Sequence, residues 1–498
     1  MFNKNRSKLN GKNNQLILTC FEYKVHLIKI KLYSKYVASN VLTMKLNHTK
    51  IGIWGLGIVG KAAIKYLSNN QCHLSVMDNK TIDKEDSEFL AKHNASFFSE
   101  EQLEQFFNNN ETILVSAGIN HPACKTYKHK IINELDLFCT DFKKPIIAVT
   151  GTVGKTTVVS LLSQLLNKSM RVCTGGNIGI AMLDLIKEQE ESDTALLELS
   201  SFQLAHATQF TPELAIWTNC YPNHIDWHKS YADYFLSKQN IMRQQKSGQK
   251  ALLPLNIVEQ LLDLHKKDVD WYAFSPEAPT CNQKEKLKTI VSSFFYIKDD
   301  AIVFEDKIGI KKLIKLKDVP NITFTENWII IAATLKILNL PVSTTIQSLP
   351  TFDLPEHRLE LIAKINGISF YNDSKSTTVA STQAAIKKLN SDPIILILGG
   401  ISKGIDREPL IKNIDDSVKY IVCFGKERKQ LRQYAEKYKK ACCSVETLDE
   451  AFQQCIKIAQ HKEQVLFSPS GASFDQFNDY KERGTYFKKL AHTFKVRI

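Results

Sequence analysis

The sequence predicts an α/β fold built from three domains with parallel sheets. Short apolar runs rich in β-branched residues alternate with stretches of helical periodicity along most of the chain. Two glycine-rich turns, at residues 55–60 and 151–154, each follow such a run and precede a helical stretch. A chain of 498 residues is also long enough for several separate cores.

We place the domain boundaries where this alternation is interrupted. Residues 1–48 are rich in Lys and Asn and weakly periodic, so they are predicted to be an extension, either disordered or the product of a start codon placed too early. The predicted domains are residues 49–142, 143–354 and 355–498. A linker, Asp353-Leu354-Pro355-Glu356, separates the last two.

The composition disfavours a nucleic-acid-binding protein, a disulfide-bonded protein and a membrane protein. The net charge of +13 comes from 65 Lys and Arg against 52 Asp and Glu, but no basic run is interleaved with aromatic residues, which disfavours a nucleic-acid partner. The 11 cysteines form no C-x-x-C pair and fit the reduced thiols of a cytoplasmic protein. No run approaches the roughly 18 apolar residues that a membrane helix requires. We expect a cytoplasmic monomer that contacts no membrane.

The first domain begins with a strand, a tight turn and a helix. Lys50–Trp54 reads as the strand, Gly55–Gly60 as the turn, and the next strand, His73–Met77, runs into Asp78, 18 residues after Gly60. This spacing indicates a Rossmann-like unit with an acid placed for a ribose hydroxyl. A nucleotide or nucleotide-sugar site is favoured over a purely structural turn. Residues 112–119 read as a further strand.

The central domain carries the strongest motif of the chain. Pro145–Val149 is predicted to be a buried strand, and residues 158–166 a helix. Between them lies Gly151-Thr152-Val153-Gly154-Lys155-Thr156-Thr157, in which backbone N–H groups and the helix N-terminus can hold phosphate oxygens. Lys155 adds a positive charge and Thr156 a hydroxyl for Mg²⁺. The motif predicts a nucleoside triphosphate site, although two residues rather than four separate its glycines; an ordinary glycine turn is the alternative.

Three polar residues farther along the central domain are candidates for the same site. Glu198 lies near the end of the apolar run Thr194–Leu199, where an acid serves to hold Mg²⁺ or forms a structural ion pair. His224 follows the strand 214–219 and fits a position near the phosphates or the substrate better than a zinc site. Lys238 lies in the next helix, where the sequence alone favours a solvated lysine. Residues 249–318 read as irregular with short strands and charged turns, and a buried helix begins at Glu326.

The third domain again alternates strands with helices. Its strands are predicted at residues 368–371, 394–398, 420–424 and 465–467. Polar loops follow at residues 372–378, 399–406 and 468–475, and in open α/β sheets the loops at the carboxyl ends of strands bind ligands. The domain is therefore predicted to be a second Rossmann-like unit with a binding site in these loops.

Taken together, these motifs resemble the Mur ligases of peptidoglycan synthesis, over the chain from about Lys50 to its C-terminus. The Gly-Thr-x-Gly-Lys-Thr-Thr motif at residues 151–157 is typical of the whole family. Three further motifs are similar to those of the members that add D-glutamate: residues 175–179 (Gly-Gly-Asn-Ile-Gly), 198–204 (Glu-Leu-Ser-Ser-Phe-Gln-Leu) and 468–475 (Ser-Pro-Ser-Gly-Ala-Ser-Phe-Asp).

The resemblance implies a role for each candidate residue. It implies catalytic roles for Lys155, Glu198, His224, Lys238 and Arg358. ATP would contact Gly151, Thr152, Val153, Gly154, Lys155, Thr156, Thr157, Asn327, Arg358 and Asp373. Two Mg²⁺ ions would be held by Thr156, Glu198, His224 and Lys238, the last as a carbamate formed from CO₂, which replaces its reading as a solvated lysine. The UDP-linked substrate would contact Gly57, Val59, Asp78, Asn120, Asn177 and His224, and D-glutamate would contact Lys375, Thr377, Lys403, Ser473 and Tyr480.

The chain departs from the family pattern at a few positions. Val153 stands where an asparagine is usual, but backbone donors make the cradle, so nucleotide binding should survive. Val59 replaces a usual Ser or Thr, which removes one hydroxyl worth about 1 kcal/mol. Ala117 replaces a proline, Tyr480 a phenylalanine, and Asn223 an acid. Looser substrate binding is the expected consequence.

The activity implied by the resemblance is an ATP-dependent amide ligation that joins D-glutamate to UDP-N-acetylmuramoyl-L-alanine through an acyl phosphate, in peptidoglycan precursor synthesis. Two alternatives stay open. One is a related ligase, of another Mur type or of the folylpolyglutamate type. The other is a nucleotide-binding homologue without catalytic activity.

Overall fold

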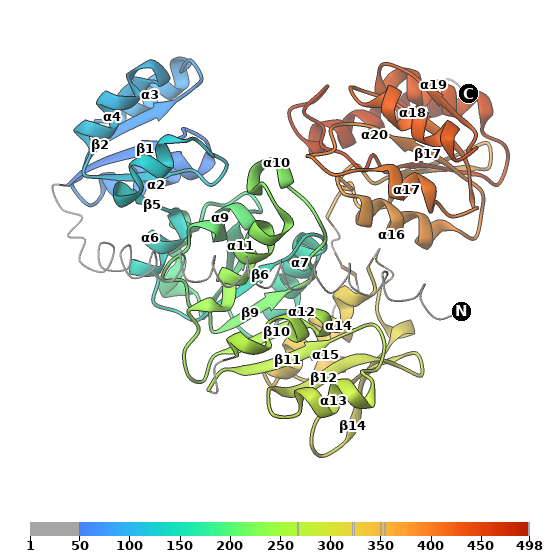
Figure 1. Cartoon of the computed structure of the whole chain (residues 1–498), viewed down its shortest axis with the longest axis horizontal. Coiled ribbons are helices and arrows are strands. Elements are labelled where there is room, and N and C mark those ends of the chain that lie inside the picture. Colours follow the sequence, from blue (N-terminus) through green and yellow to red (C-terminus); the bar gives the residue numbers. More distant parts are fainter. Residues whose placement is uncertain are drawn as a thin grey trace, which may run out of the picture. The chain divides into compact units, whose positions relative to one another are not determined.

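The computed structural model describes residues 49–265, 268–320, 322, 324–348, 351–352 and 355–496. The predicted extension at residues 1–48 and residues 353–354 of the predicted linker lie outside these ranges. The described chain is a mixed α/β protein with three sheets (Figure 1), which confirms the predicted fold class.

Contacts along the described chain divide it into two compact units. The first holds residues 49–150, 170–215 and 235–251, and the second holds residues 151–169, 216–234 and 252–496. The boundaries predicted after residues 142 and 354 stay predictions.

The first sheet has five parallel strands in the order β3-β2-β1-β4-β5. The strand order changes direction at β1, so the crevice at the carboxyl ends of β1 and β4 is where a Rossmann-like sheet binds its ligand. The strand predicted at residues 112–119 ends at Val115, because Ile119 N–H donates to the Ser116 carbonyl (3.0 Å) and closes a turn. The strands are β1 (Lys50–Trp54), β2 (His73–Asp78), β3 (Ser96–Ser99), β4 (Thr112–Val115) and β5 (Ile131–Ile132). The helices are α2 (Ile58–Ser68), α3 (Lys84–Lys92), α4 (Leu103–Asn109), α5 (Ala123–Thr126) and α6 (Glu134–Asp141).

The second sheet has nine strands in the order β14-β13-β12-β11-β10-β9-β6-β8-β7. Strands β6 and β8, both buried along their whole length, pair in parallel, as expected for strands covered on both faces. The strands are β6 (Ile146–Thr150), β7 (Val172–Gly176), β8 (Thr194–Glu198), β9 (Leu214–Trp217), β10 (Lys250–Pro254), β11 (Asp270–Phe274), β12 (Val291–Lys298), β13 (Ala301–Glu305) and β14 (Ile310–Lys315). The helices are α7 (Lys155–Leu166), α8 (Met182–Leu185), α9 (Ser201–Ala205), α10 (Ile225–His228), α11 (Tyr231–Arg243), α12 (Leu255–Gln260), α13 (Cys281–Leu287), α14 (Glu326–Ile337) and α15 (Val342–Gln347).

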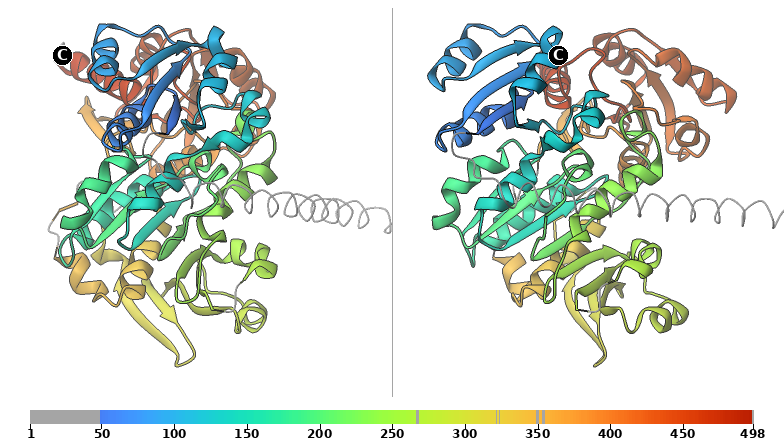
Figure 2. Two further views of the ribbon diagram at one scale, coloured as in Figure 1. Left: turned by 90° about the vertical axis from the view of Figure 1, so that its left-hand side faces the viewer. Right: turned by 60° about the vertical axis from the view of Figure 1, so that its left-hand side comes forward.

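Residues 249–318 are more regular than the sequence predicts. Strands β10 to β14 continue the nine-stranded sheet, and β12, β13 and β14 form an antiparallel meander that ends in the yellow hairpin of Figure 2. The sequence signal is weak because β14 is an edge strand whose exposed side chains include Lys311 and Lys312. Lysines on an edge discourage further strand pairing and hide the apolar alternation.

The third sheet has six strands in the order β15-β16-β20-β17-β18-β19, parallel except for the antiparallel pair β15–β16. The strands are β15 (Glu360–Ile365), β16 (Ile368–Asn372), β17 (Ile394–Leu398), β18 (Val418–Cys423), β19 (Cys442–Ser444) and β20 (Gln464–Phe467). The helices are α16 (Val379–Leu389), α17 (Glu408–Lys412), α18 (Arg428–Lys437), α19 (Leu448–Ile458) and α20 (Tyr480–Val496).

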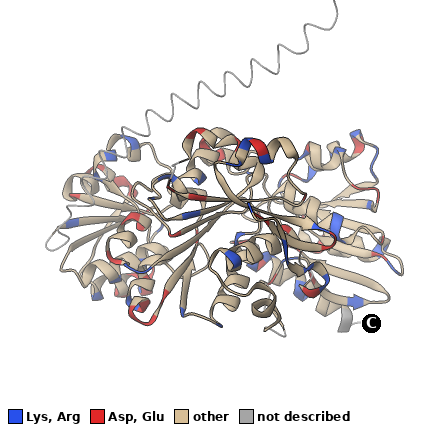
Figure 3. Ribbon diagram, turned by 90° about the horizontal axis from the view of Figure 1, so that it is seen from below, with Lys and Arg blue, Asp and Glu red and all other residues tan. Residues whose placement is uncertain are grey.

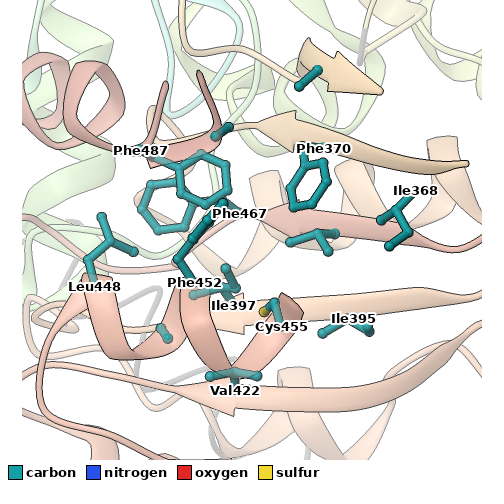
Figure 4. Close-up of a cluster of buried hydrophobic side chains, with 14 of the residues drawn as sticks. Ile368, Phe370, Ile395, Ile397, Val422, Leu448, Phe452, Cys455, Phe467 and Phe487 are labelled. Carbon is teal, nitrogen blue, oxygen red and sulfur yellow. The ribbon is translucent and has the colours of Figure 1, made fainter. Parts of the chain in front are cut away.

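Strand β17 has apolar side chains on both faces of the third sheet, and helices cover both faces. Ile395 and Ile397 pack with Phe452 of α19 and Phe487 of α20 (Figure 4). The alternate residues of β17, including Leu396, pack with α16, α17 and α18 on the opposite face. Successive side chains of a strand point to opposite faces, so an entirely apolar strand requires a helix layer on each.

The last general features of the described chain are the distribution of its charged residues and the apolar character of its helices. Basic and acidic residues are interspersed along the ribbon (Figure 3). Across the residues placed by the structure, we find no helix with both the length and the apolar character to cross a membrane.

Candidate active site

The loop between β6 and α7 is shaped by two glycines in left-handed backbone conformations. Gly151 has φ +147° and Gly154 has φ +86°. A Cβ on Gly151 would lie 1.9 Å from Thr218 Oγ1, and one on Gly154 would lie 2.5 Å from Asn327 Oδ1. Both positions therefore require glycine for conformation and for space. The loop delivers the chain to the N-terminus of α7 at Lys155, where backbone N–H groups can hold an anion.

The side chain of Lys155 folds back onto this loop. Its Nζ donates to the carbonyl oxygens of Gly151 (2.9 Å) and Thr152 (3.2 Å). The ammonium is thus already next to the place where the loop would hold phosphate oxygens. This is the position that a phosphate-binding lysine requires.

A pocket of about 210 Å³ opens beside the loop within the second unit. Arg358 and Asn327, both predicted to contact ATP, line it together with Thr157 of α7. The rest of its wall is mostly apolar and aromatic, which suits a planar base: Ile322, Phe324, Pro355, Leu359, Tyr371, Lys388 and Leu389.

Glu198 is a buried carboxylate at the carboxyl end of β8 and is 1% exposed. Its Oε1 accepts a hydrogen bond from Asn177 Nδ2 (2.9 Å). Its Oε2 is buried and has no hydrogen-bond partner among the residues that the structure describes. A buried carboxylate oxygen left in this way is costly, and a bound cation would satisfy it, so the residues fit Mg²⁺.

Lys238 and His224 are both unusual for their residue types. Lys238 is 1% exposed and its Nζ lies 3.5 Å from Thr150 Oγ1, so its reading as a solvated lysine is wrong. Lysines are almost never buried to this extent unless they are paired. His224 has φ +55°, a conformation that costs energy in a non-glycine residue and is typical of functional loops. Across the described residues, no cluster of three or more His, Cys, Asp or Glu is arranged to hold a metal.

Four of the six residues predicted to contact the UDP-linked substrate lie at the carboxyl edge of the first sheet. The other two belong to the second sheet, where Asn177 follows β7 and His224 precedes α10. Gly57 and Val59 follow β1, and Asn120 follows β4. Asp78 ends β2, where its Oδ2 accepts a hydrogen bond from the Leu56 N–H (2.7 Å). Asp78 therefore holds the glycine turn in place, whereas the sequence predicted only a contact with a ribose for this residue.

Four of the five residues predicted to hold D-glutamate form two pairs at the edge of the third sheet. Lys403 Nζ donates to Thr377 Oγ1 (3.4 Å), and Lys375 Nζ lies 3.8 Å from the centre of the Tyr480 ring. Burial lowers the pKa of Lys403 to about 8, against the attraction of Asp226.

Two further predicted residues lie in the same loops: Asp373, predicted to contact ATP, and Ser473, predicted to contact D-glutamate. Asp373 Oδ1 accepts from the Leu359 N–H (3.0 Å) and Oδ2 from the Ser468 hydroxyl (2.7 Å). Burial raises the pKa of Asp373 to about 6. Ser473 is 2% exposed and follows Ala472, whose backbone pairs with Ile401. The loops after β17 and β20 are therefore tied together.

Two buried arginines support these loops and were missed by sequence reasoning. Arg483, which is fully buried in α20, donates to the Ser374 hydroxyl and carbonyl and to the Gly471 carbonyl. Arg407 donates to the carbonyls of Gly399 and Gly400. An arginine in a polar helix or loop looks solvated in a sequence, and no local signal distinguishes these two.

The structure joins the predicted residues in local groups. In the first unit, Asn177 is hydrogen-bonded to Glu198. In the second, Asn327 lies against Gly154, Asn327 and Arg358 share a pocket, and the D-glutamate pairs described above are formed.

Comparison with known families matches three parts of the chain in order. Residues 50–124 match the MurD N-terminal domain, residues 149–309 the Mur ligase middle domain, and residues 357–471 the glutamate ligase domain of Mur ligases.

Curated relatives extend this match over nearly the whole chain. The UDP-N-acetylmuramoylalanine–D-glutamate ligase of Thermoanaerobacter sp. (strain X514) is 30% identical over 459 residues, which cover 90% of this chain and 98% of that protein. The enzyme of the same name from Acetivibrio thermocellus is 30% identical over 482 residues, or 92% and 99% of the two chains.

Solved structures share the fold at low sequence identity. A pseudomurein peptide ligase type C from Methanothermus fervidus has a TM-score of 0.54 at 15% identity, with 90% of this chain and 100% of that chain covered. A MurF ligase from Thermotoga maritima in complex with ADP has a TM-score of 0.54 at 14% identity, with 90% and 99% covered.

Proposed function

Because the chain belongs to the Mur ligase family, in its UDP-N-acetylmuramoylalanine–D-glutamate ligase branch, we propose that it joins D-glutamate to UDP-N-acetylmuramoyl-L-alanine with conversion of ATP to ADP and phosphate. The end-to-end alignment with ligases of that name carries the assignment. The match of residues 50–124 to the MurD N-terminal domain favours this branch over other Mur ligases and the folylpolyglutamate type.

The reaction requires activation of a carboxylate. The alanyl carboxylate attacks the γ-phosphorus of ATP, which forms an acyl phosphate and releases ADP. The amine of D-glutamate then attacks the acyl carbon, loses a proton and expels phosphate from a tetrahedral intermediate. The first step brings two anions together, so its barrier depends on cations placed around the γ-phosphate.

Lys155 and Arg358 are proposed to supply protein charge for this step. Lys155 already lies over the phosphate loop, and Arg358 lines the neighbouring pocket. We assign the adenine base to the apolar part of that pocket, which Asn327 lines. Asp373 is assigned to the ribose on the resemblance to the family alone.

Thr156, Glu198 and His224 are proposed to hold Mg²⁺, with Lys238 contributing as a carbamate. The buried Oε2 of Glu198 and the burial of Lys238 support this set. When bound, Mg²⁺ neutralises phosphate charge and so eases the approach of the carboxylate. Carbamate formation joins the lysine nitrogen to the carbon of CO₂. The ammonium loses one proton before the attack and the nitrogen loses a second one afterwards, so a cationic side chain becomes an anionic one.

The remaining predicted residues are assigned to the two other substrates. Lys375, Lys403 and Thr377 are suited to the two carboxylates of D-glutamate, because each can donate hydrogen bonds and two are cations. Ser473 and Tyr480 complete that site. The carboxyl edge of the first sheet, with Gly57, Val59, Asp78 and Asn120, is assigned to the UDP-linked substrate, as is Asn177.

A coupled assay of ADP release tests the proposal. The protein is expected to release ADP only when UDP-N-acetylmuramoyl-L-alanine and D-glutamate are both present. Lys155→Ala and Glu198→Ala should each lower turnover by orders of magnitude. Stimulation by L-lysine or meso-diaminopimelate in place of D-glutamate would reject the choice of amino acid, and ATP binding without any amino-acid-dependent turnover would indicate a non-catalytic homologue.

A further inference from the structure

The segment that follows β9 contacts the phosphate loop through Asn219. This residue is half-buried and lies two positions after the end of β9 at Trp217. Its backbone carbonyl accepts hydrogen bonds from the Thr152 N–H (3.1 Å) and from the indole N–H of Trp217 (3.0 Å). The backbone of Asn219 is therefore anchored both to the phosphate loop and to its own strand.

The side chain of Asn219 makes the closer connection. Its Oδ1 accepts from the backbone N–H groups of Thr152 (3.2 Å) and Val153 (3.0 Å). Its Nδ2 donates to the Val153 carbonyl (3.0 Å), which also accepts from the Thr218 hydroxyl (2.7 Å). One amide thus satisfies a donor and an acceptor of Val153 at the same time.

These bonds divide the loop into two functional parts. The N–H groups of Thr152 and Val153 both donate to the side chain of Asn219. The N–H groups of residues 154–157 begin α7, and the first four N–H groups of a helix have no partner within the helix. The N–H groups of residues 154–157 can thus bind an anion, and their orientation depends on how residues 152 and 153 are held.

The same bonds account for Val153, which stands where Mur ligases usually have asparagine. The residue is 9% exposed, and its links to Asn219 and Thr218 all use its backbone. No polar side chain at position 153 is needed for this arrangement. The departure from the family motif is thus compatible with an intact phosphate loop.

We propose that Asn219 is a positioning residue for the triphosphate: its side-chain amide holds residues 152–153 so that the N–H groups of residues 154–157 converge on the phosphates. The inference rests on the proposed function, because the triphosphate is that of ATP. Asn219 itself touches no phosphate. Its removal should therefore act on nucleotide affinity and leave the amino-acid site unchanged.

The test compares Asn219→Ala and Asn219→Asp with the wild type. Loss of the amide should raise the KM for ATP and the Kd for ADP about tenfold, since each hydrogen bond has a modest net value and the backbone bond to Thr152 remains. The KM for D-glutamate should stay within about twofold. Asn219→Asp keeps the acceptors but places a carboxylate against the Val153 carbonyl, so it should raise the KM for ATP at least as much.

Asn167→Ala is the matched control. Asn167 follows the far end of α7, where its Nδ2 donates to the Ser163 carbonyl (2.8 Å), and its replacement should leave the KM for ATP unchanged. Equal KM and Kd values in wild type and Asn219→Ala, or a change only in the thermal unfolding midpoint, would overturn the inference. If the wild type shows no D-glutamate-dependent ADP release, the proposed function fails, while the calorimetric Kd for ADP still decides the role of Asn219.

Discussion

Replacement of Gly154 by alanine offers a direct measure of how far the phosphate loop depends on its geometry. The residue has φ +86°, in which an L-amino acid costs about 1–2 kcal/mol. The new Cβ would lie 2.5 Å from Asn327 Oδ1 and 3.3 Å from its Cγ, so the whole amide must move. Asn327 is 3% exposed, which leaves its side chain little room to do so.

The expected rise in the KM for ATP follows from two costs, the strained backbone at position 154 and the displaced amide of Asn327. Displacement of the Asn327 amide forfeits about 1 kcal/mol if it bonds the nucleotide. With the backbone term, the binding-competent loop becomes less stable by about 2–3 kcal/mol. Because the apparent affinity falls with the population of the competent form, the KM for ATP should rise about 30- to 150-fold.

The assay is ADP release at varied ATP, and Gly248→Ala is its control. Gly248 has φ +83°, nearly the same as Gly154, but no atom lies within 4 Å of the place that a Cβ would take there. This variant should lose a similar amount of unfolding free energy and keep the wild-type KM. The reasoning is refuted if Gly154→Ala retains a KM for ATP within twofold of the wild type, or if Gly248→Ala raises the KM equally.

Three further predictions concern titration, the core and the amino-acid site. Burial raises the pKa of Glu134 to about 7, so the folded protein binds more protons than the unfolded chain between about pH 4.5 and 7, and the free energy of unfolding should fall as the pH rises through that window. Glu134→Gln should abolish this slope in chemical denaturation, and an unchanged slope would contradict it. Phe452→Ala should lower the free energy of unfolding by about 3–5 kcal/mol, because the ring is 1% exposed among the aromatic residues of Figure 4; a loss below about 1 kcal/mol would argue against the packing. Tyr480→Phe should keep the KM for D-glutamate, since Lys375 stays over an aromatic face, whereas Tyr480→Leu should raise it severalfold; equal values in both variants would exclude a role for the ring.

Most of the fold was predictable because its signals are local. The apolar runs that became β1, β6, β8 and β17 are continuous in sequence, and a parallel strand buried on both faces needs no alternation to be recognised. The meander β12–β14 was predicted less well, because lysines on its edge strand mask the alternation.

The candidate site was predictable to the extent that its residues belong to contiguous motifs. The phosphate loop, Glu198 at a strand end and the polar loops of the third sheet are each recognised within a few residues. The burial of Lys238 could not be predicted in this way, because its Nζ lies near Thr150, 88 residues away in the sequence.

The sequence by itself determined the fold class, the family motifs and the place of the phosphate loop, since strand, loop and helix follow one another without interruption at residues 146–166. Only the tertiary structure decided which groups hold that loop and which are left for a ligand. Asn219 lies 66 residues from Val153, and Asp78 lies 22 residues from Leu56, whose N–H donates to its carboxylate. Hydrogen bonds of this kind depend on strands that become neighbours only when the sheets form, and no local pattern encodes them.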